Sequence, residues 1–114
     1  MAGALFENYI IQETLKSFIN KGKQPNIYYI RTHNELEIDI IIEKSMKLFP
    51  IEIKLTKSPT INMMKNIDRF NDLFSKLRIE NGKIVCLSDN DDQLTKNVSV
   101  SSINSYLKWL KELI

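Results

Sequence analysis

Residues 35–55 read ELEIDIIIEKSMKLFPIEIKL. Polar and apolar residues alternate on both sides of Ser45-Met46, a pattern typical of two half-buried strands joined by a short turn. We therefore expect an antiparallel hairpin with strands over residues 35–43 and 47–55. One face of this hairpin is predicted to carry the apolar side chains of Leu36, Ile38, Ile40, Ile42, Phe49, Ile51, Ile53 and Leu55.

The register of the hairpin determines which polar side chains meet on its other face. Directly opposite residues of an antiparallel pair project from the same face. A turn centred between Ser45 and Met46 places Asp39 opposite Glu52, with Lys54 one step along the same face. A turn centred one residue earlier or later leaves them diagonal neighbours. Like charges placed opposite each other destabilise a sheet. A bound cation would compensate for this repulsion.

Two neighbouring carboxylates offer oxygen ligands alone, which suit a hard ion such as Mg²⁺ or Mn²⁺. Such an ion can polarise a phosphodiester and lower the pKa of a bound water. Lys54 would then orient that water or stabilise the phosphate. The pattern alone leaves an alternative open, an amphipathic hairpin whose polar face carries Glu35, Glu37, Asp39, Glu43, Glu52 and Lys54.

The rest of the chain predicts a single α/β domain over residues 1–114, which is too short for two cores. The other predicted elements are a helix over 4–20 ended near Gly22, a strand over 26–32, a helix from Ser58-Pro59 to about Arg78, strands over 83–88 and 98–100, and a helix over about 102–113. A helical crossover after the third strand predicts a mixed sheet flanked by helices.

Glu7 lies on the predicted inward stripe of the first helix, together with Ile11, Leu15 and Phe18. A carboxylate in that position costs free energy unless a cation or hydrogen-bond donors meet it. The alternative is a partly exposed residue in the first turn, where a glutamate suits the helix dipole. Both interpretations stay open.

Composition excludes several other classes of protein. The longest apolar runs are far below the roughly 18 residues that span a bilayer, so we expect no membrane segment. The first residues lack the basic region of a secretory signal, and Cys86 stands alone, so a cytoplasmic location is predicted. The acidic loop at Asp89, Asp91 and Asp92 lacks the glycine and terminal glutamate of an EF-hand and is predicted to be a solvated turn.

Basic residues gather after the third strand, although the net charge of +2 is too small to indicate nucleic-acid binding by itself. Lys57 precedes the predicted helix that carries Lys65 and Arg69. The pattern favours a solvated helix face for most of them, and contact with phosphate is a hypothesis. Trp109 could stack on a base, but a partly buried position in the core is favoured.

Three segments, Glu7, Glu37-Ile-Asp39 and Ile51-Glu-Ile-Lys54, resemble the PD-(D/E)XK nuclease signature in order and spacing. More narrowly, the chain resembles the domain of unknown function found at the C-terminus of many bacterial and archaeal AAA-type ATPases. The segments that carry this second resemblance are Gly3-Ala-Leu-Phe-Glu-Asn-Tyr-Ile, Tyr28-Tyr-Ile-Arg-Thr, Glu37-Ile-Asp-Ile-Ile-Ile-Glu, Pro50-Ile-Glu-Ile-Lys, Leu87-Ser-Asp, Leu94-Thr-Lys-Asn-Val and Ile103-Asn-Ser-Tyr-Leu.

The resemblance implies a restriction-endonuclease-like αβββαβ core, extended by a short strand and a C-terminal helix. It implies that Asp39 and Glu52 ligate Mg²⁺ or Mn²⁺, that Lys54 is catalytic, and that Glu7 completes the site. Arg31 matches a Tyr-x-Arg pattern of the family and would contact phosphate. The signature's proline is absent, because Ile38 precedes Asp39.

The function implied is that of a Mg²⁺-dependent nuclease-like domain acting on or binding DNA. No P-loop occurs in the sequence, so an ATPase domain would be a partner in cis or in trans. The alternative is a catalytically silent DNA-binding or protein-interaction module of such an ATPase. Whether the chain also forms a homodimer is left open.

Overall fold

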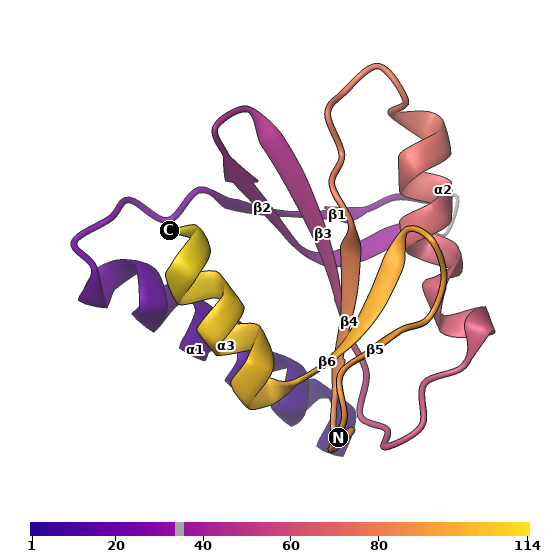
Figure 1. Cartoon of the computed structure of the whole chain (residues 1–114), viewed down its shortest axis with the longest axis horizontal. Coiled ribbons are helices and arrows are strands. Elements are labelled where there is room, and N and C mark those ends of the chain that lie inside the picture. The colour runs from indigo at the N-terminus through magenta and orange to yellow at the C-terminus, as the bar shows by residue number, and fades with distance from the viewer. Residues whose placement is uncertain (34–35) are drawn as a thin grey trace.

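The protein is described by a computed structural model covering residues 1–33 and 36–114 (Figure 1). The predicted turn residue Asn34 and the predicted strand residue Glu35 lie outside the described residues. The elements are α1 (Ala2–Asn20), β1 (Ile27–Arg31), β2 (Glu37–Lys44), β3 (Lys47–Ile53), the 3-10 helix η1 (Ile61–Met64), α2 (Lys65–Leu73), β4 (Gly82–Cys86), β5 (Asp92–Gln93), β6 (Val98–Ser102) and α3 (Ile103–Leu113).

The strands form one mixed sheet in the order β1-β2-β3-β4-β6-β5. The first three strands and the β5–β6 pair run antiparallel, whereas β4 is parallel to both β3 and β6. The predicted mixed α/β fold, with an αβββαβ order followed by a further strand and a C-terminal helix, is confirmed. The short edge strand β5 was not predicted.

Helices cover both faces of the sheet (Figure 1). On one face, α1 and α3 pack over a core that includes Ile10, Ile42 and Tyr106. On the other face, α2 packs over a second core that includes Ile67 and Ile84. In the described part of the chain, no helix combines the length and the apolar character that crossing a membrane requires.

The predicted hairpin register is confirmed, since Ile40 pairs with Ile51 and Lys44 with Lys47. The turn between the strands places both Ser45 and Met46 at positive φ, 54° and 65°. Such a turn follows the right-handed twist of the two strands, which is why it favours two-residue hairpins.

The predicted apolar face of the second strand is wrong, because β2 contains a bulge. Tyr28 pairs with Ile41 and Ile30 with Ile38, so two steps along β1 correspond to three along β2. An extra residue of this kind reverses the alternation of a strand. Ile40 therefore belongs to the core under α1 and α3, whereas Ile38 belongs to the core under α2.

The predicted helix from Ser58 to Arg78 is shorter at both ends. It begins as a 3-10 turn after Thr60, and α2 ends at Leu73. Residues after the helix return to the sheet, because Leu48 N donates to Arg78 O and Glu80 N donates to Leu48 O, each at 2.8 Å. Backbone pairing with the sheet thus takes the place of a further helical turn.

Candidate functional site

The β2–β3 ladder ends at Ile40 and Ile51, whereas β3 stays paired with β4 as far as Ile53. Two side chains take over the hydrogen bonding at the next position. Asp39 N donates to Glu52 Oε1 at 3.2 Å, and Ile53 N donates to Asp39 Oδ2 at 2.7 Å. The two carboxyl groups are therefore fixed against the backbone of each other's strand.

Glu52 is the more buried of the two, with 1% of its surface exposed. Its Oε2 accepts a long hydrogen bond from Asn66 Nδ2 at 3.5 Å and lies 3.6 Å from Lys54 Nζ. Burial, and then the negative charge of Asp39, raise the pKa of Glu52 to about 8, against the lowering effect of Lys54. Burial and the neighbouring Asp39 carboxyl group therefore disfavour the charged form of Glu52.

Glu7 lies in α1, is partly exposed, and interacts with the side chain of Asp39. It lines a cavity of about 260 Å³ together with Asp39, Arg31 and Glu37. Burial raises the pKa of Glu7, and both the charge of Asp39 and a hydrogen bond with its side chain add to this effect. The Glu7 side chain thus lies next to that of Asp39 at this cavity.

The basic residues predicted to contact nucleic acid differ in their relation to the carboxylates. Arg31 ends β1 beside the cavity, and its Nε lies 3.6 Å from Glu37 Oε1 on the exposed surface. Lys57 follows β3, whereas Lys65 and Arg69 are exposed residues of α2. In the described part of the chain, the cavity that holds Glu7 and Asp39 is not lined by Lys57, Lys65 or Arg69.

Asn66 belongs to the site but was not identified from the sequence. Its Nδ2 donates to Glu52, and its Oδ1 accepts from the backbone N–H of Glu37 at 3.5 Å. An asparagine in the first turn of an exposed helix carries no signal of this role. Only the packing of α2 against the sheet brings it beside the buried carboxyl group.

Residues 2–106 match the family described as Domain of unknown function (DUF4143). The chain belongs to this family. No curated protein and no solved structure matches the DUF4143 chain. The family match covers nearly the whole sequence and names no activity, so the chemistry of this DUF4143 domain has to be argued from the site itself.

Two carboxylates of the DUF4143 domain, Asp39 and Glu52, are of the chemical type that hard divalent cations prefer. Within residues 1–33 and 36–114, no three side chains of His, Cys, Asp or Glu form a metal-binding group. Mg²⁺ commonly binds through one or two carboxylates, while water and substrate phosphate complete its shell. Asp39 and Glu52 supply such a pair, and the raised pKa of Glu52 marks a site where added positive charge would be favourable.

Proposed function

We propose that this domain is a Mg²⁺-dependent nuclease-like domain that acts on DNA phosphodiesters. The observation that carries the proposal is the opening of the β2–β3 ladder at Asp39 and Glu52. There, Glu52 lies beside Lys54 and hydrogen-bonds to the backbone of Asp39, and the side chain of Asp39 interacts with Glu7 of α1. The resemblance of these four residues to the PD-(D/E)XK signature supports the same assignment.

Each residue has a separate role in this proposal. Asp39 and Glu52 would hold Mg²⁺ or Mn²⁺, which when bound polarises a phosphodiester and lowers the pKa of a water. The Lys54 ammonium, which neighbours Glu52, would orient the attacking water and offset charge on the phosphate. Glu7 would position Asp39 through their hydrogen bond.

The test is cleavage of duplex, branched and single-stranded DNA with Mg²⁺ or Mn²⁺. We expect wild type to cut at least one of these substrates. Asp39→Asn and Lys54→Met should lose about a hundredfold or more of the activity, as is common when a charged group of an active site is removed. Asp72→Asn, an exposed acid on α2, is the matched control and should cut like wild type. Failure of wild type on every substrate would rule the proposal out.

The alternative function is a catalytically silent module that binds DNA or docks on an AAA-type ATPase domain, in cis or in trans. One observation favours it: both oxygens of Glu52 already have partners inside the protein. This alternative expects Asp39→Asn to leave partner binding and stability unchanged or to raise stability. A melting temperature that Mg²⁺ raises in wild type but not in Asp39→Asn would contradict it.

Two further points concern the cellular compartment and the oligomeric state of the domain. The lone cysteine, Cys86, is fully buried in β4, which fits a reducing compartment such as the cytoplasm. A measurement of mass in solution would show whether the domain works as a monomer or as a homodimer.

A further inference from the structure

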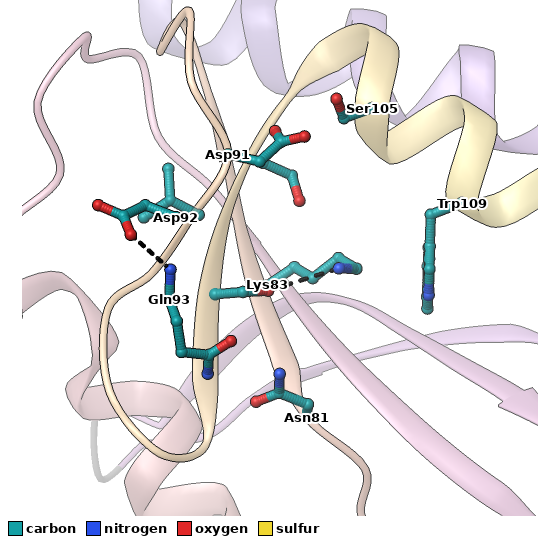
Figure 2. A pocket seen from close by; sticks show the side chains of 10 residues that line it. Asn81, Lys83, Asp91, Asp92, Gln93, Ser105 and Trp109 are labelled. Carbon is teal, nitrogen blue, oxygen red and sulfur yellow. Dashed lines mark hydrogen bonds between the residues drawn. The ribbon is translucent and has the colours of Figure 1, made fainter.

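A second cavity, of about 500 Å³, opens between the strands β4, β5 and β6 and the helix α3 (Figure 2). Its lining includes Lys83, Ser99, Asn81 and Trp109, together with two carboxylates, Asp91 and Asp92. It belongs to the face of the sheet that carries α1 and α3. Glu52 lies on the opposite face, beside Asn66 of α2, so the two sites are separate.

The alternation of β6 explains why this cavity exists. Val98 and Val100 belong to the core under α2, so Ser99 and Ser101 project toward the side of α3. A strand covered by helices on both faces is usually apolar on both. Here small hydroxyl side chains line the α3 side, and they leave space that the helix does not fill.

Lys83 is the charged group at the centre of this space (Figure 2). Its Nζ lies 4.9 Å from the centroid of the Trp109 ring and 3.4 Å from Ser99 Oγ. Burial lowers the pKa of Lys83, and the more distant charge of Asp91 opposes this effect. Within the described part of the chain, no carboxylate oxygen lies within 4.0 Å of the ammonium.

Asp91 does not serve as the missing partner, because its carboxylate caps α3. Oδ1 accepts from the backbone N–H of Ser102 at 3.0 Å, and the side chain also hydrogen-bonds with Ser105. These hydrogen bonds lower the pKa of Asp91, Ser105 first. At the amino end of the helix, Ser102 N and Ser105 N thus both have side-chain acceptors.

A partly buried ammonium with no carboxylate at ion-pair distance is unfavourable, and a ligand that places an anion on it would relieve this. We propose that the cavity binds a small organic anion, with a carboxylate or phosphate head group on Lys83 and a polar body between Asn81 and Trp109. A cavity of this volume lies within the range of small-molecule sites and is larger than a bare ion requires. The proposal does not depend on nuclease activity at Asp39 and Glu52.

Trp109 makes the proposal directly measurable, because it is the single tryptophan of the chain. Its fluorescence is followed while inorganic phosphate or lactate is added at constant ionic strength, with chloride as the reference anion. We expect a saturable change with at least one of the two probes. A response to phosphate alone indicates a phosphate ester as ligand, and a response to lactate alone indicates a carboxylic acid.

Lys83→Met should weaken the affinity about tenfold or more, since it removes a charged hydrogen-bond donor. Lys108→Met is the matched control, because Lys108 is an exposed residue of α3 outside the cavity, and it should titrate like wild type. An equal response in Lys83→Met and wild type would overturn the proposal, and so would the absence of any saturable change.

Circular dichroism shows whether Lys83→Met folds. If it does not, the same anions are titrated into wild type and followed by NMR. Saturable shifts of the Trp109 indole N–H and of the Lys83 and Ser99 amides would support the site. Shifts that match those caused by chloride would overturn it. Amides around Glu52 serve as an internal reference, because that carboxyl group lies on the other face of the sheet.

Discussion

The side chains of Asp39 and Glu52 each hydrogen-bond to the backbone of the other residue's strand, at the point where the β2–β3 ladder ends. The backbone N–H of Asp39 donates to Glu52 Oε1, and Asp39 Oδ2 accepts from the residue that follows Glu52. The backbone donor of Asp39 favours the charged form of Glu52. For Glu52, burial outweighs this gain, and its raised pKa is the result.

Stability should depend on pH through Glu52. Its pKa rises from 4.5 in the unfolded chain to about 8 on folding, so the folded state binds the proton more tightly. The stability gained in this way is fully present below pH 4.5 and is lost as pH rises through 8. Urea denaturation should show Glu52→Gln to be less sensitive to pH than wild type over this window. Glu112→Gln, an exposed residue of α3, should follow the wild-type profile, and identical profiles for all three proteins would contradict the prediction.

Alkaline pH should destabilise the protein through Tyr106, which is fully buried beneath α1. Its hydroxyl lies 2.9 Å from Thr14 Oγ1, and burial raises the pKa of Tyr106 from 10.0 to about 12. The corresponding stability is present below pH 10 and is lost as pH rises toward 12. Tyr106→Phe should lose about 1 kcal/mol at pH 7 and show less of the alkaline loss. Thermal melts at pH 7 and pH 11 measure both effects, with Tyr28→Phe as an exposed control.

The hairpin turn should become more stable when Met46 is replaced by glycine. Met46 has φ 65° and is 85% exposed, so the substitution relieves a left-handed backbone and removes little packing. Glycine loses more backbone entropy on folding, which offsets part of this relief. We expect a net gain of about 0.5–1 kcal/mol in the free energy of unfolding. Met46→Ala keeps the same backbone problem and should show no such gain. A larger gain with alanine than with glycine would argue against this account.

Two glycines should respond to alanine in opposite directions. A Cβ on Gly82 would lie 2.8 Å from Ile67 Cγ2 and 3.2 Å from Pro50 O, so Gly82→Ala should cost about 1–3 kcal/mol. A Cβ on Gly3 would meet nothing within 4 Å, and Gly3 lies in α1, so Gly3→Ala should gain up to about 1 kcal/mol. Chemical denaturation of the two variants beside wild type measures the difference. Equal effects would show that α2 is not closely packed over Gly82.

The sequence was sufficient for the parts of the fold that depend on neighbours in the chain. The register of the β2–β3 hairpin follows from a short turn at Ser45 and Met46, and it brings Asp39 near Glu52, where side-chain hydrogen bonds replace the ladder. The first and last helices follow from their apolar periodicity and their ends. Gly22, with φ 67°, stops α1, and Ser102 caps α3 by accepting from Ser105 N.

Features set by contacts distant in the chain were not predictable in this way. The bulge in β2 arises from pairing with β1, and α2 ends early because residues 78–80 pair with Leu48. The acidic loop is solvated as predicted, since Asp89, Asp91 and Asp92 are exposed, but the contact of Asp91 with Ser102 N and the place of Asp92 in β5 were not foreseen. The contacts that Asn66 and Lys83 make in the two sites form only when a helix packs over the sheet.

The bulge in β2 lets one strand carry an extra side chain without moving its neighbours from their cores. Ile40 and Ile38 are two residues apart, yet they belong to different cores, whereas residues two apart in a regular strand project from the same face. Deletion of the residue between them would restore regular pleating and leave Ile38 and Ile40 in their present cores. The residue lost would be Asp39, so the packing of this strand does not require the position that supplies the carboxylate.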